Sequence, residues 1–342
     1  MSRRAVPPPS ASEPIVAESD RFRDDLIRAL GHVPGAPVLL AVSGGPDSMA
    51  MLTLAAQVAA AGGLPGGIAA ASVDHRLRPE AAAEAAMVAA HCAAIGVPHA
   101  TLTPHVAISG ASIQAAARSA RYGLLADHAR AIGAEALATA HHVDDQAETF
   151  LMRAARGSGL SGLAGVRPRA VIDGVVVVRP VLEWRRAELR AIVRRLEIPF
   201  VDDPANHDPA HDRTRFRRLL DANEWLGPPQ LARAAAALGD ADGDVRAIVD
   251  WLWAERARVS GASARVRVEG LPRELTRRLA RRAIGHVIAT AGLSAPKWSE
   301  AANVEALLDA LAAGKRATQA GVVAAPSGDE WRFRPAPARR TG

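Results

Sequence analysis

The chain contains a single cysteine, Cys92, among its 342 residues. One cysteine excludes an intramolecular disulfide framework, and it excludes zinc or iron–sulfur sites that need several thiolates. No run of about eighteen apolar residues free of charge occurs, so we expect neither a membrane span nor a membrane partner. Residues 1–20 also lack the apolar segment of a secretory signal. We expect them to form a disordered lead-in to a cytoplasmic protein.

Lysine is nearly as scarce as cysteine, because only Lys297 and Lys315 among the 42 basic residues are lysines. Charge is unevenly distributed. Residues 1–212 carry 20 basic and 22 acidic side chains, whereas residues 213–342 carry 22 and 14. A basic second part attracts a phosphate backbone. A solvated basic surface would have the same composition, and charge alone does not separate the two.

Short apolar runs alternate with helical patterns in the first two hundred residues. The runs typical of strands cover residues 37–42, 67–73, 100–104, 135–140 and 175–178. The stretches typical of helices cover residues 46–61, 79–95, 111–132 and 143–156. This alternation predicts an α/β fold with a doubly wound parallel sheet, in which ligands bind beyond the carboxyl ends of the strands.

The composition changes between residues 199 and 220, where a polar stretch with several prolines leads into an arginine cluster. We therefore predict a catalytic domain over residues 21–218 and a smaller, basic, mostly helical domain over residues 219–342. Helical patterns fill residues 228–313. A weak alternation of apolar and polar residues over residues 317–334 predicts a small terminal hairpin.

The most specific motif is SGGPDS at Ser43–Ser48, between a predicted buried strand and an apolar helix. Its glycines allow a tight turn, and the N–H groups at a helix start favour an anion. The two serines can add hydroxyl donors. Asp47 would repel a bare phosphate, so we interpret it as a magnesium ligand or an N-terminal cap. The chain has no GxxxxGK[ST] loop, which excludes a Walker-type kinase or GTPase site.

This motif resembles the SGGxDS signature of the PP-loop ATPases, which are adenine nucleotide alpha hydrolase-like proteins. Such enzymes cleave ATP between the α and β phosphates, adenylate a carbonyl oxygen and release pyrophosphate. The resemblance implies ATP as a substrate together with Mg²⁺, for which Asp47 is the expected ligand. With the residues at the end of the second strand, it assigns ATP contacts to Ser43, Gly44, Gly45, Pro46, Asp47, Ser48, Asp74 and His75.

Four further segments resemble tRNA(Ile)-lysidine synthetases. They read VDHRLR at Val73–Arg78, ARSARY at Ala117–Tyr122, ATAHHVDDQAET at Ala138–Thr149 followed by RGSG, and DPAN at Asp203–Asn206 followed by RTRFR at Arg213–Arg217. Ala205 departs from the serine usual in the family, which puts one hydroxyl contact in doubt. The resemblance is strong over residues 36–220 and weak afterwards.

The 141–149 segment is the densest polar cluster, and it follows a predicted strand and begins a helix. Asp145 and Glu148 lie three residues apart, so they are neighbours on one helix face. Two carboxylates can hold an ammonium group or coordinate magnesium. The resemblance favours recognition of free lysine by Asp145 and Glu148. We assign catalysis to Asp47, His141, Asp144 and Asp145.

Simpler explanations exist for each of these polar groups. Acidic residues also stabilise a helix N-terminus, and a His-His-Asp-Asp cluster could be a transition-metal site. Asp74 and His75 could cap a strand end. We assign tRNA or phosphate binding to Arg118, Arg121, Arg213, Arg215 and Arg217. The alternatives are a solvated helix face for the first two and an exposed linker for the other three.

The resemblance implies a two-step reaction on the wobble cytidine of tRNA(Ile) with a CAU anticodon, with no DNA partner. The oxygen on carbon 2 of the base attacks the α-phosphate of ATP, and the ε-amine of free lysine then displaces AMP. The nearest alternative is a tRNA thiolase of the same superfamily, against which the single cysteine argues. The other is a non-catalytic, nucleotide-dependent RNA-binding protein.

Overall fold

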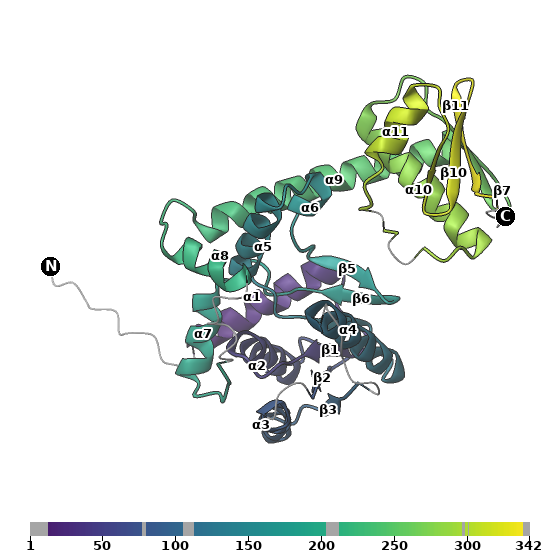
Figure 1. Cartoon of the computed structure of the whole chain (residues 1–342). Helices are drawn as coiled ribbons and strands as arrows, with labels where there is room; N and C mark the ends of the chain where they lie inside the picture. The colour runs from purple at the N-terminus through teal and green to yellow at the C-terminus, as the bar shows by residue number, and fades with distance from the viewer. Residues whose placement is uncertain are drawn as a thin grey trace. The chain divides into compact units, whose positions relative to one another are not determined.

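The computed structural model divides the chain into two compact units, residues 1–239 and residues 240–342 (Figure 1). It describes residues 13–76, 80–104, 113–202, 212–295, 298–299 and 301–337. Each unit has its own hydrophobic core. The division lies later than the boundary predicted after residue 218, because the start of helix α9 (Pro228–Arg256) belongs to the first unit, where Ala235 is buried.

The first unit is built on a six-stranded sheet with the order β3-β2-β1-β4-β6-β5. Its strands are β1 (Val38–Ala41), β2 (Ile68–Val73), β3 (His99–Leu102), β4 (Ala136–Ala138), β5 (Arg169–Ile172) and β6 (Val175–Val178). All neighbours are parallel except β5, which pairs antiparallel with β6. The predicted parallel sheet is confirmed. The edge strand β5 was not predicted, because none of its four residues is fully buried and it shows no run of apolar core residues.

Helices cover both faces of this sheet (Figure 1). The helices of this unit are α1 (Glu13–Leu30), α2 (Pro46–Ala60), α3 (Glu80–Ala94), α4 (Ile113–Ala131), α5 (Val143–Ala155), α6 (Leu160–Leu163), α7 (Arg186–Arg195) and α8 (Asp212–Asp221), of which α6 and α8 pack on α5. Val38 and Leu40 of β1 point to a core formed with α1, α2, α3 and α7, whereas Leu39 points to a core formed with α4. Alternate side chains of one strand therefore serve two layers, as a doubly wound sheet requires.

Helix α1 corrects the expectation that residues 1–20 are a disordered lead-in. The helix begins at Glu13, and residues 1–12 lie outside the described part of the chain. Its amphipathic sequence places Phe22, Leu26 and Leu30 in the core at helical spacing. The proline-rich start hid this pattern from the prediction.

The second unit contains a five-stranded antiparallel sheet in the order β7-β8-β11-β10-β9. The strands are β7 (Ala257–Ser260), β8 (Ser263–Arg267), β9 (Ala317–Gln319), β10 (Val322–Ser327) and β11 (Glu330–Pro335). Helices α10 (Arg273–Ala291) and α11 (Glu305–Ala312) pack on it. The predicted helices and terminal hairpin are present, but the first hairpin falls within residues predicted to be helical. The alternation of apolar and polar residues in this hairpin covers too few residues to be recognised between the long alanine-rich helices on either side.

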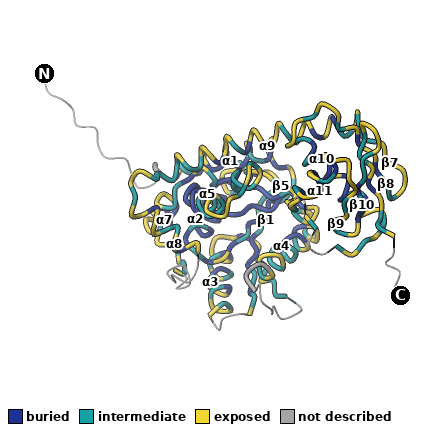
Figure 2. The backbone as a smooth tube through the Cα atoms, turned by 45° about the horizontal axis from the view of Figure 1, so that its top comes forward, coloured by how far each residue is buried: buried dark blue, intermediate teal, exposed yellow. Residues whose placement is uncertain are grey.

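Burial follows this arrangement in both units, with the central strands buried and the helix surfaces exposed (Figure 2). Among the described residues, no helix has both the length and the apolar character needed to cross a membrane.

Candidate active site

The Ser43–Ser48 loop connects the end of β1 to the start of α2. Gly44 has φ of 84°, a left-handed conformation that favours glycine. Gly45 is the N-cap of α2 and Pro46 opens the helix. The hydroxyl of Ser48 donates to the carbonyl of Gly45 at 2.9 Å and accepts from the N–H of Ser43 at 3.1 Å. Gly45 supplies no side-chain cap, so the N–H groups of the first turn are available to an anion.

Asp47 lies in the first turn of α2 beside His142, which is the N-cap of α5. Its Oδ2 lies 3.4 Å from Nε2 of His142, and its buried Oδ1 has no hydrogen-bond partner among the described residues. Because Gly45 occupies the cap position, the interpretation of Asp47 as an N-cap is wrong. A buried carboxylate oxygen without a partner fits an oxygen-seeking cation such as Mg²⁺, whose remaining ligands would come from phosphates and water.

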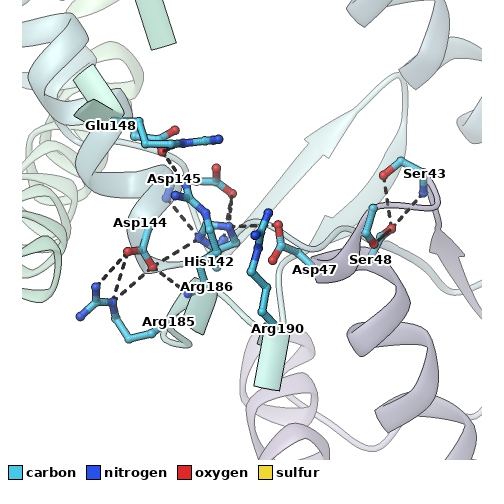
Figure 3. Close-up of polar contacts among 12 residues, drawn as sticks. Ser43, Asp47, Ser48, His142, Asp144, Asp145, Glu148, Arg185, Arg186 and Arg190 are labelled. Atoms are coloured by element: carbon cyan, nitrogen blue, oxygen red, sulfur yellow. Dashed lines mark hydrogen bonds and ion pairs between the residues drawn. The ribbon is translucent and has the colours of Figure 1, made fainter. Parts of the chain in front are cut away.

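His142 joins the phosphate loop to the acidic helix (Figure 3). Its Nδ1 accepts from the N–H of Asp145 at 3.3 Å, and the carboxylate of Asp145 accepts from the N–H of His142 at 3.2 Å. This reciprocal pair closes a capping box. Burial of the ring lowers the pKa of His142, but the carboxylates of Asp145 and Asp47 outweigh it, so that the pKa lies above its ordinary value. His142 was not among the predicted site residues.

The neighbouring His141 and Asp144 have different environments. Burial lowers the pKa of His141 to about 3, and one ring nitrogen lies 2.9 Å from the hydroxyl of Thr139. Asp144 accepts a bifurcated bond from Nε of Arg185, at 3.2 and 3.3 Å, a bond from Nη2 of Arg185 at 3.0 Å, and one from the N–H of Arg186 at 2.8 Å. Asp144 therefore holds the start of α7. Its predicted catalytic role stays a prediction, and the structure gives it a positioning contact.

Glu148 forms ion pairs with three arginines, Arg186, Arg213 and Arg217, and Figure 3 shows it on α5 near Asp145. Its side chain is 1% exposed, and it accepts from Arg186 at 2.5 Å, from Arg213 at 2.8 Å and from Arg217 at 2.9 Å. Arg213 also donates to Asp145 at 3.0 Å. Burial raises the pKa of Glu148, yet the arginines outweigh it and hold the pKa below its usual range. The two carboxylates predicted to bind lysine are thus ionised and already paired with cations.

A cavity of about 490 Å³ collects most of the predicted residues at the carboxyl ends of the strands. Its lining includes Ser43, Gly45, Pro46, Asp47, Ser48, His75, Arg121, His141, Asp145, Arg213 and Arg217. The predicted residues that do not line it are Gly44, Asp74, Arg118, Asp144, Glu148 and Arg215. The cavity therefore lies where a doubly wound sheet is expected to bind its ligand, beyond the carboxyl ends of the strands.

Several of these residues outside the lining have a local role. Asp74 accepts from the N–H of Arg76 at 2.8 Å, which closes a turn after β2 and agrees with the strand-end alternative. Arg118 lies over the ring of Tyr122, 5.2 Å from its centroid, and Arg215 is exposed. Arg78 and the DPAN segment at residues 203–206 lie outside the described residues.

Comparison with known proteins adds to this geometry. A model of the PP-loop domain matches residues 19–223. A tRNA(Ile)-lysidine synthase of Novosphingobium aromaticivorans is 41% identical over 334 residues, which covers 96% of this chain and 97% of that protein. One of Zymomonas mobilis is 41% identical over 314 residues, 88% and 89% of the two chains. The chain belongs to the tRNA(Ile)-lysidine synthase family.

A solved structure of the tRNA thiolase NcsA from Methanococcus maripaludis resembles the chain with a TM-score of 0.53. It is 17% identical, and the match covers 66% of this chain and 79% of the thiolase. At that identity the likeness shows the PP-loop fold alone, which this lysidine synthase family member shares.

Helix α7 supplies site residues of this lysidine synthase family member that the sequence did not reveal. Arg186 and Arg190 line the cavity. The guanidinium of Arg190 points toward Asp47 in Figure 3, it donates to Asp202 at 2.8 Å, and its buried Nε has no partner among the described residues. The chain holds these arginines near the loop because Leu189 and Ile192 anchor α7 in the core. The sequence of α7 contains no recognisable motif. Because the whole chain is rich in arginine, the arginines of this helix did not stand out as site residues.

Proposed function

We propose that the chain uses ATP to join free lysine to carbon 2 of the wobble cytidine in a tRNA(Ile) with a CAU anticodon. The names of the relatives support the reaction class, a ligase that forms a carbon–nitrogen bond. One observation in the structure carries the proposal: the phosphate loop and Asp145 of α5 line one cavity. Activation and lysine transfer can therefore occur in the same place.

In the first step, the oxygen on carbon 2 of the base attacks the α-phosphate, and the bond to pyrophosphate breaks. The free N–H groups of the Ser43–Ser48 loop would stabilise the pyrophosphate as it leaves. Arg121 lines the cavity and forms no hydrogen bond or ion pair within the described residues. Nearby Arg118 and Arg213 add to the effect of its burial in lowering its pKa. An anionic substrate would relieve that repulsion.

Mg²⁺ would be held by Asp47 together with the phosphates. When bound, such an ion supplies positive charge for the departing pyrophosphate. Within the described residues no group of three or more His, Cys, Asp or Glu side chains is arranged to hold a metal ion.

In the second step, the ε-amine of lysine attacks carbon 2, and the bond from carbon 2 to the oxygen of AMP breaks. Asp145 lines the cavity and is ionised, so it would attract the ammonium group on arrival. The amine must lose a proton before it attacks. His141 lies in the cavity wall in its neutral form and would accept that proton, and the phosphate of the adenylated base would offset Arg179 and Arg121, which add to the effect of burial in lowering its pKa.

The thiolase alternative has less support. Cys92 is buried in α3, and burial raises the pKa of its thiol to about 11. Such a thiol is not nucleophilic at neutral pH, and Cys92 is not among the residues that line the cavity. We propose that the basic second unit helps to bind tRNA, and that the protein works in the cytoplasm, where its proposed substrates occur.

The first step can be tested alone by incubating the protein with ATP, Mg²⁺ and a CAU tRNA(Ile) transcript without lysine. The proposal expects pyrophosphate release and an adenylated tRNA that lysine later converts to product with release of AMP. Phosphate release in place of pyrophosphate would contradict α-phosphate activation.

A further inference from the structure

Arginines from three adjacent strands of the second unit lie side by side on its sheet. In the antiparallel register Arg258 of β7 pairs with Arg265 of β8, and Arg265 pairs with Arg332 of β11. Directly opposite residues share a face, and neighbouring strands lie about 4.8 Å apart. The three guanidinium groups therefore form one row across the sheet, here called the arginine row.

This row lies on the face opposite the core. The flanking residues Ala264, Val266 and Phe333 point the other way and are buried in the second unit's core. All three arginines of the row are exposed. Figure 2 shows the strands of this unit with buried and exposed positions. The row is thus open to solvent.

The row has little compensating charge. Within the described residues none of its three arginines forms an ion pair or side-chain hydrogen bond. Arg267 and Arg334 are also exposed on these strands, at positions of the same face. The strand residues of this face include one acid, Glu330, which lies directly opposite Arg267 and outside the row.

Like charges directly opposite each other destabilise a sheet. Protection of a sheet edge against pairing explains charge on an edge strand such as β7. It does not explain Arg265 and Arg332, because β8 and β11 are interior strands. A polyanion that lies across the row would offset the repulsion.

We propose that the arginine row is a binding surface for an RNA phosphate backbone. This inference rests on the proposed function, which supplies an RNA substrate. No aromatic side chain of these strands faces outward with the row, since Phe333 is buried in the core and the half-buried Trp331 packs against that core. The face thus offers phosphate contacts without a stacking platform for bases. It contributes affinity and orientation and does not distinguish one anticodon from another.

The test is a full-length variant with Arg258→Gln, Arg265→Gln and Arg332→Gln. Its affinity for a CAU tRNA(Ile) transcript should fall on the order of a hundredfold at 0.1 M salt, and the slope of log affinity against log salt should flatten by about two to three. Affinity for a methionine tRNA transcript should fall by the same factor. ATP binding should not change, and the unfolding midpoint should stay the same or rise because like-charge repulsion is removed.

A matched control carries Arg23→Gln, Arg28→Gln and Arg194→Gln on helices α1 and α7, and it should bind tRNA as the wild type does. An unchanged affinity and salt slope in the row variant would overturn the inference, and so would an equal loss in the control. A wild-type protein that binds tRNA through the row but attaches no lysine would refute the proposed function and leave the row intact as an RNA surface.

Discussion

The carboxylate of Asp47 lies 3.4 Å from Nε2 of His142, which connects the phosphate loop of α2 to the N-terminus of α5. Through its other ring nitrogen, His142 also fixes the N–H of Asp145. One buried imidazole thus links the proposed magnesium ligand to the proposed lysine-binding carboxylate. Replacing Asp47 should therefore alter the environment of Asp145, and replacing Asp145 should alter that of Asp47.

Replacing Asp47 by asparagine tests this link. The variant loses one of the carboxylates that raise the pKa of His142, so that pKa should fall. It should also lose adenylation by roughly a hundredfold or more, because the proposed carboxylate ligand of the Mg²⁺ that would stabilise the departing pyrophosphate is gone. Histidine resonances followed by NMR against pH, with wild type as reference, measure the first effect. An unchanged His142 titration would contradict the link.

The sign of the accompanying stability effect follows from the direction of the shift. The folded wild type holds the His142 proton more tightly than the unfolded chain does. This contribution to stability is full below the ordinary pKa of about 6.5 and is lost as pH rises through the folded-state value. In Asp47→Asn the contribution should shrink, so the two proteins should differ more in urea unfolding at acidic than at alkaline pH.

Glu148→Gln should destabilise the fold as well as any lysine site. The substitution leaves Arg186, Arg213 and Arg217 around a neutral, buried amide. Removing one partner of a buried ionic cluster costs about 3–5 kcal/mol. Urea unfolding measures the loss, with Glu183→Gln, at an exposed glutamate, as the control that should change little. Equal stability of wild type and Glu148→Gln would mean that the arginine cluster does not depend on Glu148.

Arg190→Gln should raise the KM for ATP about tenfold or more, because a charge-assisted hydrogen bond to a phosphate is worth about 1.5–3 kcal/mol. Arg194→Gln provides the matched control on the same helix, since Arg194 is exposed and does not line the cavity. Steady-state kinetics with varied ATP separate KM from kcat. A KM for ATP equal to that of wild type would exclude Arg190 from the phosphate site.

Cys92→Ala should retain lysine transfer, since the thiol is buried and does not line the cavity. The loss of a buried sulfur should lower stability only modestly, by about 1 kcal/mol. Product formation by the variant and the wild type is compared at matched protein concentration. A complete loss of tRNA modification in a folded variant would favour sulfur chemistry.

Local sequence signals were enough to predict the phosphate loop and every strand of the first unit's sheet except β5. Strand β1 is uniformly apolar because both its faces are buried, and the loop needs glycine at Gly44 because φ is positive there. Both requirements restrict the residue types at these positions, so both can be recognised in the sequence. The acidic cluster on α5 was likewise visible from its position after a strand.

Contacts between segments far apart in the sequence were harder to predict. Arg190 is a site residue only because α7 packs against α2, and nothing near it in sequence signals that contact. The arginine row depends on the register of three strands, two of them joined by a hairpin and the third far along the chain. Pairs of this kind become visible only when the sheet is assembled.

The account is tested most directly by incubating the full-length protein with radiolabelled lysine, ATP and Mg²⁺, and with transcripts of CAU tRNA(Ile) and of methionine tRNA. We expect label to enter tRNA(Ile) only when ATP is present, with one AMP and one pyrophosphate formed per lysine attached. Absence of label from tRNA(Ile), or its entry into the methionine tRNA alone, would contradict the proposed function.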